Sequence, residues 1–150
     1  MILSDKTFSV REAQPADFRQ IYIINRDDLG YEYPPEKIER KLAALIISQS
    51  DKVFVAISEE KVIGYVHASD YDVIYADHMK DIMGIAVAAD FREMGVGAAL
   101  LEAVEQWAKA SGAAGIRVNS GSSRTGAHEF YRRCGYTNEK QQHRFLKFCN

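Results

Sequence analysis

The chain has 150 residues and a mass of 16.9 kDa, a length that suits one domain and leaves no room for two substantial ones. Hydrophobic residues make up 47% and charged residues 27%, which is typical of a globular protein and excludes a disordered one. The 19 Lys and Arg residues against 21 Asp and Glu residues argue against nucleic-acid binding, which depends on clustered cations. We therefore expect a single domain, residues 1–150, without a nucleic-acid partner.

Neither a membrane segment nor a metal site is indicated. The longest apolar stretch, residues 82–89, is far shorter than the roughly 20 residues that span a bilayer. The first residues lack the basic segment and apolar run of a signal peptide. Cys134 and Cys149 form no CxxC pair and have no His at metal-ligand spacing, so we expect free thiols in a reducing cytoplasm.

The first half of the chain predicts a strand, two helices and a β region. Alternation predicts a strand over 7–11, and Pro15 opens a helix that Gly30 ends. A second helix begins near Pro35, with its apolar residues on one face. Residues 53–57 and 61–67 predict a hairpin, residues 70–78 a loop or strand end, and residues 81–88 a buried central strand.

The second half predicts a long helix, a strand, a short helix and a terminal hairpin. From Gly95 onward, apolar residues recur at helical spacing until Gly112. Residues 115–119 predict a strand, and residues 127–134 a short helix that Gly135 ends. Residues 136–141 and 144–148 predict a closing hairpin. This order indicates a mixed α/β fold built on one layered sheet.

The segment that indicates chemistry is Arg92-Glu-Met-Gly95-Val-Gly97, where the central strand turns directly into the long helix. The two glycines allow a sharp turn and close approach to the backbone, and the first amides of a helix attract anions. Arg92 adds a full positive charge, so a phosphate is the expected ligand. A P-loop is excluded because no Lys-Ser/Thr follows either glycine, and a GxGxxG dinucleotide motif is excluded because Leu100 stands at its third position. Two glycines that only form a turn are the alternative.

This segment resembles the Q/R-x-x-G-x-G/A pyrophosphate loop of the GCN5-related N-acetyltransferase (GNAT) family. Residues 124–136 resemble a second segment of that family, A-x-x-(F/L)-Y-x-x-x-G-(F/Y). The resemblance implies an α+β fold in which helices flank a sheet that is splayed at its centre, where the strand ending near Val87 parts from the strand at 116–119. It also implies an enzyme that transfers the acetyl group of acetyl-CoA to a primary amine of a small molecule or peptide, by direct attack in a ternary complex.

The resemblance further implies which residues bind the co-substrate. The pantetheine arm would pair with the backbone of residues 85–87, where an amide would polarise the thioester carbonyl, and the pyrophosphate would lie on the amides of residues 92–98. Arg124 stands where many members have Asn, and Glu93 must point outward because it is acidic. The implied residues are Ile85, Ala86, Val87, Arg92, Glu93, Met94, Gly95, Val96, Gly97, Ala98, Arg124 and Tyr131.

For catalysis, the family position of Tyr131 implies a general acid that protonates the leaving thiolate, with core packing as the alternative. Glu32, in the connector between the first two helices, is the candidate general base. Alternatives for the base are a water chain and the side chains of His67, Asp70, Asp72, Asp77, His78 and Asp81.

Two further hypotheses stay open. Acids outnumber bases between residues 27 and 81, and Tyr31 and Tyr33 flank Glu32, so this half either attracts a cationic amine or carries ordinary surface charge. A non-catalytic acyl-CoA-binding module is the alternative to an enzyme. The sequence is compatible with a monomer or a homodimer.

Overall fold

The computed structural model describes residues 7–137 and 140–149, and it divides into two compact units, Met1–Val118 and Asn119–Asn150. The first unit holds β1 (Ser9–Glu12), η1 (Pro15–Asp17), α1 (Phe18–Asp28), α2 (Pro35–Ile47), β2 (Asp51–Ser58), β3 (Lys61–Tyr71), β4 (Met79–Val87), η2 (Ala89–Phe91), α3 (Val96–Ala110) and β5 (Gly115–Val118). The second unit holds α4 (Thr125–Arg133).

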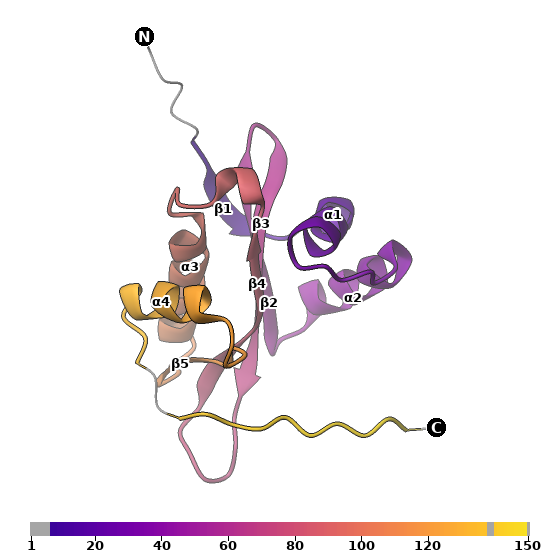
Figure 1. The fold of residues 1–150 in the computed structure, drawn as a ribbon. Coiled ribbons are helices and arrows are strands. Elements are labelled where there is room, and N and C mark those ends of the chain that lie inside the picture. The colour runs from indigo at the N-terminus through magenta and orange to yellow at the C-terminus, as the bar shows by residue number, and fades with distance from the viewer. Residues whose placement is uncertain (1–6, 138–139, 150) are drawn as a thin grey trace. The chain divides into compact units, whose positions relative to one another are not determined.

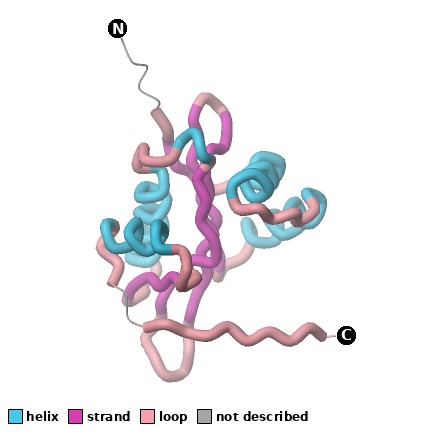
Figure 2. Tube along the Cα trace, in the orientation of Figure 1, coloured by secondary structure: helices cyan, strands magenta, loops and turns pink. Residues whose placement is uncertain are grey.

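The first unit is a five-stranded sheet between helices, as Figures 1 and 2 show. The strands lie in the order β1-β2-β3-β4-β5; the first four pair antiparallel, and β5 joins β4 in parallel. Helices α1 and α2 cover one face and α3 covers the other. The mixed sheet predicted from the sequence is confirmed.

Each face of the sheet has an apolar core because the helices carry apolar residues at helical spacing. Ile21 and Ile24 of α1 and Leu42 of α2 pack with Val53 and Val55 of β2. On the other face, α3 packs so closely that a Cβ on Gly64 would lie 3.3 Å from the Leu100 and Val96 side chains and 3.0 Å from the Ala86 carbonyl oxygen. The buried residues of α3 are Val96, Leu100, Leu101, Val104 and Ala108.

The sheet is splayed where the family resemblance implies it. Pairing between β4 and β5 runs from Met79↔Gly115 to Ile82↔Val118, whereas pairing between β4 and β3 continues to Val87. The register against β3 shifts between His67↔Gly84 and Ala68↔Ile82, which leaves Met83 as an extra residue in β4. Because a bulge bends its strand, Met83 marks the point at which β4 separates from β5.

The terminal hairpin predicted over residues 136–141 and 144–148 is wrong for the residues that the structure describes. Residues 136, 137 and 140–149 form no strand, while residues 138 and 139 lie outside the described residues. A strand exists only where another strand satisfies its backbone, and apolar side chains at 145, 146 and 148 do not supply that partner. Phe145, Leu146 and Phe148 are exposed.

Neither Cys134 nor Cys149 forms a disulfide within the described residues. No helix in the described part of the chain is long and apolar enough to cross a bilayer.

Candidate active site

The loop between β4 and α3 has the backbone that its glycine pattern predicts. Gly95, the N-cap of α3, has φ = 82°, and Glu93 adopts φ = 63° with its side chain exposed, as its acidic character requires. The Arg92 N–H donates to the Ala89 carbonyl oxygen, and the Ala99 N–H donates to that of Gly95. Between the Arg92 and Ala99 amides, the N–H groups of residues 93–98 donate to no backbone acceptor within the described residues. This row of free donors beside a helix N-terminus fits a pyrophosphate.

Asp28, at the end of α1, holds this loop and was not predicted from the sequence. Its Oδ1 accepts a hydrogen bond from the Ala89 N–H at 2.9 Å and lies 3.6 Å from Arg92 Nη2. The Arg92 Nε donates to the Val87 carbonyl oxygen at 3.3 Å. The Asp28 side chain is only 10% exposed. Arg92 therefore stabilises the loop and also supplies a positive charge beside its free amides.

Residues 85–87 lie on the part of β4 that has left β5. They pair with residues 64–66 of β3 on one side only, since pairing with β5 ends at Ile82. The other backbone edge is therefore open to an extended ligand. A pantetheine arm with its amides has the length and the hydrogen-bonding groups to pair with such an edge.

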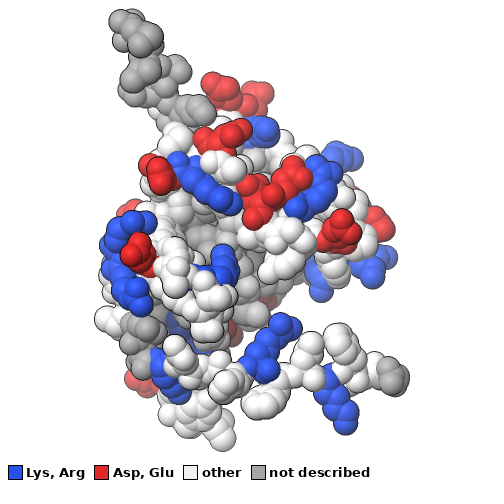
Figure 3. Space-filling model, viewed as in Figure 1, with Lys and Arg blue, Asp and Glu red and all other residues white. Residues whose placement is uncertain are grey.

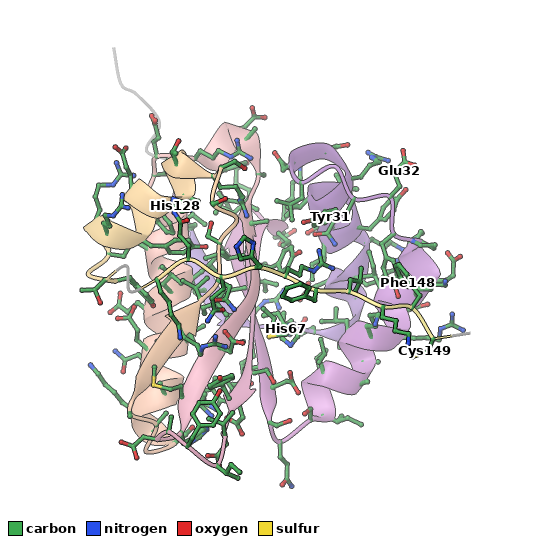
Figure 4. The ribbon with its side chains drawn as sticks, turned by 60° about the horizontal axis from the view of Figure 1, so that its bottom comes forward. Tyr31, Glu32, His67, His128, Phe148 and Cys149 are labelled. Atoms are coloured by element: carbon green, nitrogen blue, oxygen red, sulfur yellow. The ribbon has the colours of Figure 1, made fainter. Side chains whose placement is uncertain are left out.

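A hollow of about 520 Å³ opens between α1 and α2, lined by Asn25, Gly30, Tyr31, Glu32 and Tyr33. Figure 4 shows Tyr31 and Glu32 beside these helices. Asn25 accepts a hydrogen bond from the Tyr65 hydroxyl, and burial raises the pKa of Tyr65 to about 12. Tyr65 is half-buried and pairs with Ala86 of β4, so Asn25 of the hollow contacts the strand that lies beside residues 85–87.

Two of the other carboxylates proposed as bases, Asp70 and Asp81, have partners in the fold. Asp70 pairs with Lys80 and His78, and Asp81 lies 3.1 Å from Arg117 Nη1. Asp72 and Asp77 are exposed in the loop between β3 and β4. On the face shown in Figure 3, acidic and basic side chains intermingle.

Glu32, like Asp72 and Asp77, is exposed and takes part in no ion pair within the described residues, but Glu32 alone of the three lines the hollow. The carboxylate that the hollow offers to a cation is therefore that of Glu32.

The second unit carries the remaining predicted residues. Tyr131 lies on α4 with its ring centroid 5.3 Å from that of Phe130 and 6.0 Å from that of Tyr136. Burial raises the pKa of Tyr131, although the positive charge of Arg124 acts in the opposite direction. The Arg124 N–H donates to the Gly121 carbonyl oxygen, and Arg124 is the N-cap of α4. Tyr131 thus keeps its phenolic proton at neutral pH.

Comparison with known families identifies the family of this fold. The model of the "Acetyltransferase (GNAT) family" matches residues 18–136. The chain belongs to this family. Its members use acetyl-CoA as co-substrate, which agrees with the free amides of the loop. The resemblance and the fold class inferred from the sequence are therefore confirmed. A comparison with curated proteins finds no match.

Solved structures with the same fold include several acetyltransferases. AAC(6')-Iy in complex with a bisubstrate analogue is 18% identical with a TM-score of 0.84, over 95% of this chain and 99% of that one. The aminoglycoside 6'-N-acetyltransferase AAC(6')-Ih from Acinetobacter baumannii is 15% identical with a TM-score of 0.83, over 96% and 100%. A transcriptional regulator from Bacillus halodurans C-125 is 22% identical with a TM-score of 0.80, over 95% and 99%. At these identities the likeness shows the fold alone.

Proposed function

We propose that this protein is an N-acetyltransferase that transfers the acetyl group of acetyl-CoA to a primary amine of a small molecule or peptide, by direct attack in a ternary complex. The observation that carries the proposal is the arrangement within the first unit. An anion-binding loop, an open strand edge and a hollow with an unpaired carboxylate follow one another along β4 and the helices that cover it.

The co-substrate residues are those that the family resemblance implies. The free amides of residues 93–98 and the guanidinium of Arg92 would hold the pyrophosphate, and the backbone of residues 85–87 would pair with the pantetheine arm. Acetyl-CoA supplies the acetyl group as a thioester. An amide at Ile85 or Val87 would donate to the carbonyl oxygen as negative charge develops there.

The hollow would bind the amine. The exposed Glu32 carboxylate has no ion pair within the described residues, and the flanking Tyr31 and Tyr33 rings offer faces that attract cations. The centroid of the Tyr33 ring lies 5.8 Å from Lys37 Nζ and 5.7 Å from Lys41 Nζ, so this ring is in contact with cations in the structure. The two solved neighbours named above as acetyltransferases act on, or bind an analogue of, aminoglycosides, which are amines. These features support a cationic amine as acceptor.

Tyr131 would give a proton to the departing sulfur. The raised pKa of this phenol keeps it protonated at neutral pH, so the proton is present when the thiolate forms. The amine must also lose a proton, since an ammonium group with a pKa near 10 is only about 0.1% neutral at pH 7, a cost of about 4 kcal/mol. Glu32 is the candidate base from the sequence, and its place in the hollow suits capture of the ammonium group.

We further propose that residues 1–150 act as one acetyltransferase domain in the cytoplasm. The family match from residue 18 to residue 136 extends across both units, which supports a single functional domain. Two cysteines that form no disulfide within the described residues are typical of a reducing compartment.

The test is a screen of the wild-type protein with acetyl-CoA and a panel of amines, measured as thiol release. The panel includes aminoglycosides, polyamines, amino acids and peptides with a free N-terminus or lysine. We expect release that depends on the amine. The Tyr131→Phe variant should lower kcat about 100-fold with CoA affinity unchanged. Tight CoA binding without thiol release with any amine would favour a non-catalytic acyl-CoA-binding module instead.

A further inference from the structure

The first unit contains an acid–imidazole pair that the proposed function leaves unused. His67 Nε2 lies 2.8 Å from Asp51 Oδ1, and the two side chains are 24% and 15% exposed. Ser48 Oγ and Ser50 Oγ donate to Asp51 Oδ2 at 2.8 Å and 3.1 Å. The carboxylate is therefore held from three sides, and the imidazole is fixed against it.

The pair lies on the face of the sheet that α1 and α2 cover. His67 pairs with Val53, whose side chain belongs to the core of that face, and it lies two residues from Tyr65 on the same strand. Side chains two residues apart on a strand lie on the same face, roughly 7 Å apart. The Tyr65 hydroxyl donates to Asn25, which lines the hollow, and His67 is the next side chain on this face of β3. Figure 4 shows His67 at the strands.

Gly84 leaves open space beside this imidazole. Gly84 is the residue of β4 that pairs with His67, and nothing lies within 4 Å of the position that a Cβ would take there. Gly84 also directly precedes residues 85–87, where the thioester end of acetyl-CoA is proposed to lie. A reacting amine between the hollow and β4 thus has room next to His67.

The hydrogen bonds define which nitrogen of His67 accepts a proton. A carboxylate only accepts hydrogen bonds, so Nε2 carries the hydrogen and Nδ1 carries a lone pair. Nδ1 has no hydrogen-bond partner within the described residues. Burial raises the pKa of Asp51, but hydrogen bonds from His67 and the serines outweigh it and lower the pKa. Asp51 thus stays ionised and stabilises an imidazolium.

We infer that His67 is the general base of the reaction and that Asp51 is the residue that positions it, an inference that rests on the proposed N-acetyltransferase function. The ammonium group gives one proton to His67 Nδ1, and the neutral nitrogen forms a bond to the thioester carbonyl carbon. The carbon–sulfur bond breaks, the thiolate takes a proton from Tyr131, and the second amine proton restores the phenol. The imidazolium then releases one proton to water.

This pair and the ionisable side chains on the strands beside it come from β2, β3, β4 and β5. Asp51 belongs to β2, Tyr65 and Tyr71 to β3, and Asp81 to β4, where Arg117 of β5 neutralises it. The second acid–imidazole pair, His78 with Asp70 at 2.9 Å, differs because the buried Lys80 ammonium shares the same carboxylate oxygen. His78 is therefore a matched control for His67.

The experiment compares His67→Gln, Asp51→Asn, Glu32→Gln and His78→Gln with the wild type, on the best amine of the panel. We measure kcat and KM against pH, CoA affinity by calorimetry, and rescue of His67→Ala by added imidazole. We expect His67→Gln to lose about 100-fold in kcat at pH 7 and less at high pH, where the amine is itself neutral. Asp51→Asn should show a smaller loss in the same direction, and imidazole should restore part of the activity of His67→Ala.

The controls separate this inference from the proposed function. CoA affinity should be unchanged in all variants, His78→Gln should keep wild-type kcat, and Glu32→Gln should raise the KM for the amine more than it lowers kcat. An unchanged kcat and pH profile in His67→Gln would overturn the assignment while the transferase function stands. The assignment would also be overturned if the pH dependence of kcat were lost in Glu32→Gln and kept in His67→Gln. A wild-type protein that acetylates no amine would overturn both proposals.

Discussion

Asp28 shows how one carboxylate outside the motif organises the loop that binds the co-substrate. Its contacts with the Ala89 N–H and the Arg92 guanidinium connect α1 to the turn before α3. We expect Asp28→Asn to weaken acetyl-CoA binding about tenfold, because hydrogen bonds to a charged group contribute about 1.5–3 kcal/mol. Calorimetry measures this affinity. Asp27→Asn is the control because, among the described residues, the ion pair of Asp27 is with Arg26 on the surface. Equal affinities of the two variants would contradict this role of Asp28.

Gly95 combines a backbone requirement with closeness to the expected phosphates. We expect Gly95→Asp to abolish CoA binding, since a carboxylate would crowd and repel the pyrophosphate. Gly112 is a matched control: it follows the other end of α3, has φ = 74° against 82° for Gly95, and has equally open space at its Cβ position. Both Asp variants should lose similar stability in thermal unfolding, but only the one at Gly95 should lose CoA affinity. Retained affinity in Gly95→Asp would refute the loop assignment.

The turn of the β2–β3 hairpin lacks the residues that its backbone conformation favours. Glu59 and Glu60 adopt φ = 51° and 65°, the pattern of a two-residue type I′ turn, which favours Asn-Gly. Replacing them by Asn-Gly should stabilise the protein by about 1 kcal/mol, because a non-glycine residue in this conformation costs about 1–2 kcal/mol. Denaturant unfolding measures the gain. A Gln-Gln variant removes the same charges without changing the backbone preference, so an equal gain there would show that charge is the cause.

Elements defined by local pattern could be predicted from the sequence. The helical spacing of apolar residues from Val96 onward, followed by Gly112, predicted α3 nearly to the residue. The nearly uncharged run over residues 81–88 predicted β4. The terminal hairpin could not be predicted, because an apolar pair at Phe145 and Leu146 does not reveal whether a strand is available to pair with it. In the site, Gly95 and Gly97 predicted the loop between β4 and α3. Asp28 and the pair of Asp51 with His67 were not, because each joins residues far apart in the sequence.

The stability of the whole molecule depends on a charge buried between β4 and α3. Lys80 is 2% exposed, its ammonium lies 3.6 Å from the centroid of the Trp107 ring, and it donates to Asp70. Burial raises the pKa of Asp70, but the hydrogen bonds from Lys80 and His78 outweigh it and lower the pKa. Asp70 therefore stabilises the fold fully above its unfolded pKa of about 3.9 and loses this contribution as pH falls through the lower folded pKa.

We expect Asp70→Asn to destabilise the protein by about 3 kcal/mol at pH 7, because it leaves a buried ammonium without its carboxylate. Its stability should also change less with pH below about 4 than that of the wild type. Urea unfolding at a series of pH values measures both, with the exposed Asp72→Asn as control. A loss no greater than that of Asp72→Asn would show that Lys80 does not depend on Asp70.

The molecule as a whole is proposed to move one acetyl group from sulfur to nitrogen, and analysis of the product tests this most directly. Wild-type protein is incubated with acetyl-CoA and the amine panel, and thiol release is compared with the mass and position of the acetyl group on the recovered amine. We expect one acetyl group on a primary nitrogen for each thiol released. Thiol release without an acetylated amine, or CoA binding without any thiol release, would contradict it.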